Sequence, residues 1–170
     1  MNSYVAAALN IVTAVGILEG LIFLIGIGYA FSLWARGILP AVLRLGNGLA
    51  KRKIAIFAKN DNLTSLKALL MDSKLFRERN IFEIAKKEDL GRAAQATVYL
   101  VFWPDWRDSV GEILDKKPDE CALVVYAPLD GGRIPEDQMK QLDGERNTAV
   151  TNFRGRLLND IVTALITTAL

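Results

Sequence analysis

Polar side chains that could bind a ligand gather in two short stretches, each of which follows an apolar segment. The first covers residues 59–65 and the second covers residues 103–108. We expect both to be loops beyond the carboxyl ends of strands, where open α/β sheets bind their ligands. The candidate ligand-binding residues in these loops are Asn60, Asp61, Asn62, Thr64, Trp103, Asp105 and Trp106.

Two tryptophans in a polar loop are unusual, and two interpretations of them stay open. The rings of Trp103 and Trp106 could stack on a base or another ring of a ligand. Alternatively, they pack against a neighbouring subunit or a lipid surface.

A third candidate is an anion site at residues 152–156, where a strand is expected to lead into the last helix. Backbone amides at a helix start attract anions, and Arg154 and Arg156 would reinforce them. The phosphate of a nucleotide could bind there. The alternative is that the two arginines pair with acidic neighbours such as Asp160.

One carboxylate, Glu112, closely follows the tryptophan-containing loop and is the candidate catalytic residue. In a cleft it could act as a general base or hold a ribose. The alternative is a solvated residue on the outer side of a helix.

Composition excludes several classes of site. The chain has no histidine and a single cysteine, Cys121, which argues against zinc, haem and iron–sulfur sites and against a histidine-based triad. We expect no metal, although magnesium held by carboxylates stays open. Neither G-x-G-x-x-G nor G-x-x-x-x-G-K-[ST] occurs. The net charge of +2 gives no argument for direct nucleic-acid binding.

The elements that must position these residues alternate between strand and helix patterns. Apolar runs predict strands over residues 54–58, 80–84, 97–102, 122–126 and 148–153. Helical spacing predicts helices over 63–70, 89–95, 108–117 and 135–142, and a last one carrying an apolar stripe over 157–166. This alternation predicts an α/β domain over residues 54–170, with a five-stranded parallel doubly wound sheet in the order 2-1-3-4-5.

An apolar run from Val5 to Trp34 precedes this domain and contains one charged residue, Glu19. Its length predicts a single transmembrane helix over residues 1–35. A cleaved signal peptide is the weaker alternative, because the start lacks basic residues and the run is too long. Basic residues follow the helix, so we expect an inner-membrane protein with its N-terminus outside and its domain in the cytoplasm.

Small and polar residues predict that this helix self-associates. Gly16 and Gly20 form a GxxxG pair, and Thr13 adds a small residue one turn earlier. Glu19 lies at the centre of the run, where an ionisable group faces a bundle interior or a water-filled cavity. The oligomer then either carries Glu19 along a pore or uses a protonated carboxyl to bond a neighbouring helix.

Residues 36–53 mix apolar and basic side chains with Gly37 and Pro40. This composition predicts an amphipathic connector lying along the inner leaflet. The alternative is a simple linker.

From Asp105 to about Ile166 the chain resembles a TIR-type domain, which has a flavodoxin-like fold. The resemblance rests on Asp105-Trp106, on Glu112-Ile113, on the strand at 123–126, on the turn Ile134-Pro135-Glu136-Asp137 and on the closing amphipathic helix. It implies that Glu112 could cleave NAD. TIR-like domains fused to membrane helices also resemble bacterial antiviral effectors that respond to nucleotide signals.

These observations favour a non-enzymatic, membrane-anchored oligomeric effector or sensor. Its cytosolic domain would bind a nucleotide-like signal or a partner protein and control a membrane assembly, with antiphage defence as one setting. The alternatives are a membrane-bound NAD hydrolase that uses Glu112 and a membrane scaffold without activity. The expected partners are membrane lipid and further copies of the chain, and the only expected cofactor is a nucleotide or NAD.

Overall fold

The computed structural model describes the backbone of residues 2–168 and the side chains of residues 13–38, 46 and 52–168. The chain divides into two compact units, residues 1–43 and residues 44–170. The first unit is purely helical, and the second contains the α/β fold.

The first helix, α1, spans Asn2–Lys51. Its segment Thr13–Ile38 has a mean hydropathy of 2.0 and none of it is buried inside the chain. This segment is therefore long and apolar enough to cross a membrane. The connector predicted for residues 36–53 is helical as far as Lys51. Its placement on a leaflet stays a prediction, since the side chains of residues 39–45 and 47–51 lie outside the described residues.

The α/β unit is built on one five-stranded sheet. Its strands are β1 (Ile54–Phe57), β2 (Ile81–Ile84), β3 (Val98–Phe102), β4 (Ala122–Tyr126) and β5 (Thr148–Thr151). They are parallel throughout and lie in the order β2-β1-β3-β4-β5. The predicted fold class and strand order are thus confirmed.

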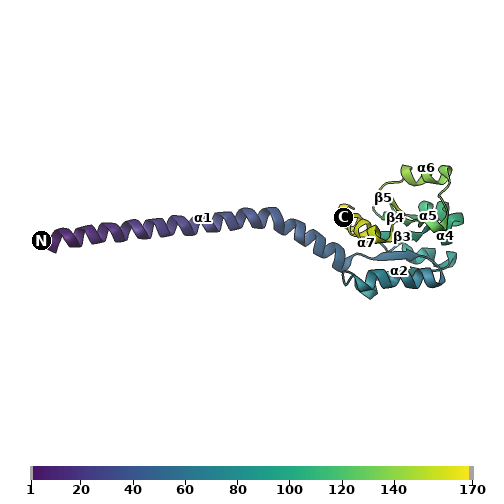
Figure 1. Cartoon of the computed structure of the whole chain (residues 1–170), viewed down its shortest axis with the longest axis horizontal. Helices are drawn as coiled ribbons and strands as arrows, with labels where there is room; N and C mark the ends of the chain where they lie inside the picture. Colours follow the sequence, from purple (N-terminus) through teal and green to yellow (C-terminus); the bar gives the residue numbers. More distant parts are fainter. Residues whose placement is uncertain (1, 169–170) are drawn as a thin grey trace. The chain divides into compact units, whose positions relative to one another are not determined.

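Helices cover both faces of the sheet. One face is packed by α2 (Asn60–Asp72) and α7 (Arg154–Thr167), and the other by α3 (Leu90–Ala93), α5 (Val110–Lys116) and α6 (Glu136–Gly144). Figure 1 shows α2 and α6 on opposite sides of the strands. The inner strands β1 and β4 are buried along their whole length, and the central strand β3 is buried up to Phe102, as expected for strands that are covered on both faces.

Short helical turns complete the connections. They are α4 (Trp103–Trp106) and the 3-10 turns η1 (Glu78–Asn80), η2 (Lys87–Asp89), η3 (Arg107–Ser109) and η4 (Leu129–Gly131). The expectation of loops at 59–65 and 103–108 is therefore wrong, because α2 begins at Asn60 and because α4 and η3 occupy the second stretch. Pro104 lies in the first turn of α4, where its fixed φ suits a helix start.

The element limits otherwise differ from the predictions at their ends. The helix expected over 89–95 is the four-residue α3 after a 3-10 turn. β5 ends at Thr151, two residues early, and this residue pairs with Tyr126, the last residue of β4.

We predict that Ile161→Ala lowers the free energy of unfolding by about 2–5 kcal/mol, because Ile161 on α7 has no exposed surface. Ile166→Ala is the matched control on the same helix. Ile166 is 46% exposed, so we expect a loss below about 1 kcal/mol. Urea unfolding followed by circular dichroism measures both, and equal losses would contradict this packing of α7.

Candidate functional site

Two predicted ligand-binding residues meet beyond the carboxyl ends of the neighbouring strands β1 and β3. The Asp105 carboxylate accepts hydrogen bonds from the Lys59 backbone N–H at 2.7 Å and from the Asn62 side-chain amide at 3.2 and 3.3 Å. Lys59 is the N-cap residue of α2, so Asp105 satisfies a donor at the start of that helix. The carboxylate therefore holds α2 against the end of β3.

The neighbouring predicted residues are exposed around this contact. Asn60 has a φ of 47°, a left-handed conformation that asparagine tolerates better than most residues. Among the described residues, the side chains of Asn60, Asp61 and Thr64 have no hydrogen-bonding partner, and all three are exposed.

Trp103 and Trp106 lie in the core, each with 2% of its surface exposed. The Trp106 ring meets Phe57 edge to face at 5.6 Å, and the Lys59 amine lies 5.6 Å from the centre of the same ring. Neither indole presents a face to a ligand, to a second subunit or to lipid in this structure. Both interpretations of the pair are therefore wrong, because the rings pack within their own chain. Large aromatic rings are more stable in the core than in an open cleft, because the core removes their apolar surface from water.

Arg154 and Arg156 have different surroundings. The Arg154 guanidinium donates to the Ser65 carbonyl at 3.0 Å and to the Ser65 hydroxyl at 2.9 Å, which ties the start of α7 to α2. Asp160 is therefore not its partner. Arg156 is exposed and has no hydrogen bond or ion pair to a described side chain. The predicted anion site keeps one uncommitted arginine.

The candidate catalytic carboxylate, Glu112, is paired rather than isolated. Its Oε1 lies 2.5 Å from the Lys87 amine, and both side chains are about half exposed. A solvent-exposed ion pair of this kind stabilises the fold little. The carboxylate faces water beside an ammonium group, which matches the surface alternative better than a general base in a cleft.

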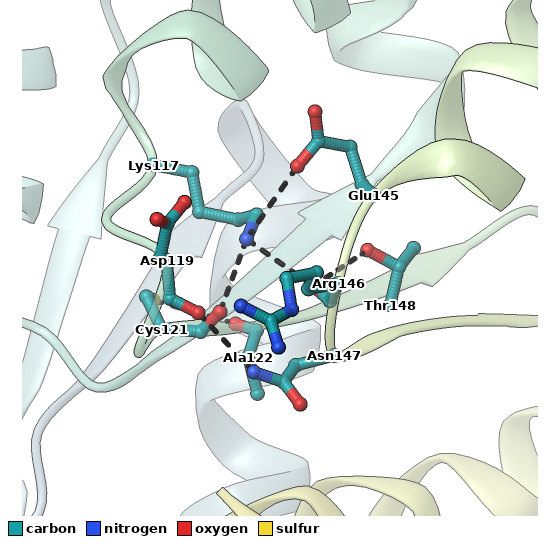
Figure 2. A network of polar contacts seen from close by, with 8 residues as sticks. All are labelled: Lys117, Asp119, Cys121, Ala122, Glu145, Arg146, Asn147 and Thr148. Atoms are coloured by element: carbon teal, nitrogen blue, oxygen red, sulfur yellow. Dashed lines mark hydrogen bonds and ion pairs between the residues drawn. The ribbon is translucent and has the colours of Figure 1, made fainter.

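The buried amine of Lys117, which lies before the start of β4, was not predicted from the sequence. Its side chain is 1% exposed and lies 3.8 Å from the Glu145 carboxylate. The amine donates to the carbonyls of Cys121 at 3.3 Å and Arg146 at 3.2 Å, as Figure 2 shows. Lys117 thus joins the connection before β4 to the connection before β5. Nothing in the local sequence signals its burial.

The single thiol is also buried. Burial raises the pKa of Cys121 to about 12, although the nearby Lys117 amine acts in the other direction. A buried thiol with a raised pKa is a poor nucleophile.

The structure also contains a cavity of about 500 Å³ at the carboxyl ends of β4 and β5. It lies between the segment that follows β4 and the end of β5. Its lining consists of Ala127, Pro128, Leu129, Gly132, Arg133, Ile134, Met139, Val150 and Asn152. Of these lining residues, Asn152 begins the stretch predicted as an anion site, and the others were not predicted from the sequence. The sequence signal that could have indicated a site is that residues 127–134 directly follow a strand of a parallel sheet.

Glycines shape the segment that borders this cavity. A Cβ on Gly131 would lie 2.4 Å from the Pro104 ring carbon Cγ, so the segment rests directly on α4. Gly132 has a φ of 88°, which favours glycine. The Ala127 N–H donates to the Thr151 carbonyl at 2.9 Å. The cavity wall is therefore held in place by contacts within the chain.

Comparison with known proteins assigns no family or function to the chain. No protein-family model, curated protein or solved structure matches the chain. Within the described residues, no group of three or more acidic, cysteine or histidine side chains is arranged to hold a metal ion. The TIR-like resemblance stays a prediction.

We predict that Asp105→Ala lowers the free energy of unfolding by about 1–2 kcal/mol, because the start of α2 loses its acceptor. Asp108→Ala is the control, since Asp108 is exposed and has no side-chain partner among the described residues. We expect its effect to stay within about 0.5 kcal/mol. Similar stabilities of the two variants in urea would mean that Asp105 does not cap α2.

We predict that Gly131→Ala lowers the free energy of unfolding by about 1–3 kcal/mol, because a rigid proline ring blocks the added methyl group. Gly111→Ala in α5 meets open space and should be neutral or stabilising. Thermal unfolding of both variants tests this, and a neutral Gly131→Ala would show that the segment is not braced on Pro104.

Proposed function

We propose that this protein is a membrane-anchored, oligomeric effector or sensor. Its cytosolic α/β domain binds a nucleotide-like signal or a partner protein and controls an assembly of membrane helices. The observation that carries this proposal is the apolar segment Thr13–Ile38, which contains Glu19 and of which no part is buried.

The length of this segment suits a bilayer. It has 26 residues, and a rise of about 1.5 Å per residue makes it longer than the roughly 30 Å hydrocarbon core. An exposed apolar helix of this kind is unfavourable in water and favourable in lipid. Anchoring of the α/β domain to a membrane follows.

Glu19 supplies the reason for assembly. A carboxyl group deep in lipid is costly unless it finds a polar partner or water. Gly16 and Gly20 lie close to it on the helix surface, and a Cβ on either would meet nothing within the chain. A second helix can therefore approach closely there and offer its own Glu19 as a partner. Several copies would enclose these carboxyls along one axis.

The described side chains support binding rather than catalysis. Glu112 is paired with Lys87 at the surface, and Cys121 is buried with a raised pKa. A sizeable cavity lies at the edge of the sheet where α/β domains bind ligands. Ligand binding at that edge is a route by which the domain could change how the copies associate.

We predict that Glu19→Gln changes the membrane depolarisation caused by expressing the full chain, because glutamine carries no charge at the centre of the helix. Gly28→Leu is the control. Gly28 is nine residues away, about two and a half turns, so it lies on the opposite side of the helix. A voltage-sensitive dye reports depolarisation, and mass photometry of the detergent-purified chain reports assembly.

The two readouts separate the possible outcomes. An altered depolarisation in Glu19→Gln, with wild-type behaviour in Gly28→Leu, supports an assembly that places Glu19 at its axis. Unchanged depolarisation in Glu19→Gln, or a monomeric wild-type chain, would overturn the proposal.

A further inference from the structure

The cavity beside β5 combines an apolar interior with two polar groups. Most of its lining is apolar, and the side chain of Ile134 in its wall is buried. Asn152 and Arg133 are the side chains in the lining that can form strong hydrogen bonds. Small-molecule sites in proteins commonly have this composition and a volume of about 300–1,000 Å³.

Arg133 is the one charged residue in this lining. Among the described residues its guanidinium has no acidic partner and no hydrogen bond, in contrast to Arg154, which is bound to Ser65. Arg133 is therefore the positive charge that this lining offers to a ligand. An anionic group, above all a phosphate or carboxylate, complements a guanidinium with two parallel hydrogen bonds.

The apolar part of the lining calls for an apolar body on the same ligand. Leu129 is 75% exposed, more than any other large hydrophobic residue that the structure describes. Val150, on the edge strand, is also exposed. A flat ring lying against these two side chains would remove their surface from water. The Asn152 amide can both donate and accept, which suits the polar edge of a nucleobase.

We propose that this cavity binds a nucleoside monophosphate or a ligand of the same chemistry. Arg133 binds the phosphate, Asn152 binds the edge of the base, and Leu129 and Val150 pack against the ring. This inference rests on the proposed function, because it assigns a place and a chemical class to the signal. It differs from the site expected at Arg154 and Arg156.

Isothermal titration of the full chain in nanodiscs with AMP tests the proposal, with adenosine and inorganic phosphate as the two halves of the probe. We expect AMP to bind about tenfold more tightly than either half. Arg133→Gln should weaken AMP binding about tenfold and leave adenosine binding unchanged, because only the phosphate contact is lost. Asn152→Ala should weaken AMP and adenosine alike.

Arg156→Gln is the matched control, since Arg156 is another exposed arginine without a described partner. It should bind AMP as the wild type does. Both arginines are exposed, so neither change should lower the melting temperature. The proposal is overturned if AMP does not bind, if phosphate alone binds as tightly as AMP, or if Arg156→Gln weakens binding while Arg133→Gln does not.

This titration and the depolarisation experiment fail independently. Absence of AMP binding removes the assigned ligand and leaves the effect of Glu19→Gln as the measure of the membrane assembly. Conversely, AMP binding that depends on Arg133 upholds the site even where Glu19→Gln behaves as the wild type.

Discussion

A parallel sheet of this kind depends on apolar cover over both of its faces. Two separate clusters of buried side chains supply that cover, one under α2 and α7 and the other under α3, α5 and α6. Trp103 and Trp106 belong to the second cluster. Although polar residues surround them in the sequence, both rings therefore pack in the core. With both faces covered by helices, the ends of the strands are where polar side chains from several strands can meet a ligand.

The polar groups at the two ends of the strands have different roles. Where β4 and β5 begin, Lys117 is enclosed by backbone carbonyls and Glu145. Its amine therefore bonds within the chain and stabilises the fold. At the opposite end, Asp105 and Arg154 also bond to their own chain. Arg133 and Asn152 remain uncommitted beside the cavity. This contrast is what separates residues that build the domain from residues available to a ligand.

Candidate residues were harder to predict than the fold. Asp105 and Asn62 were correctly placed at one edge, because the carboxyl ends of parallel strands meet there. Their use in holding α2 was not predictable, since a carboxylate that caps a helix and one that binds a ligand look alike in sequence. Glu112 and Lys87 lie 25 positions apart, and only folding shows that they pair. In the segment that borders the cavity, Gly131 fits closely against Pro104, and no local pattern encodes this contact.

The sequence by itself determined the long apolar helix, the α/β alternation and the strand order. Local periodicity and the handedness of strand connections are sufficient for these features. Tertiary structure decided which polar groups bond within the chain and which remain available to a ligand. It also decided which aromatic rings are buried, and it created the cavity after β4. These properties depend on distances between residues far apart in the chain, and hydrophobic periodicity carries no information about such distances.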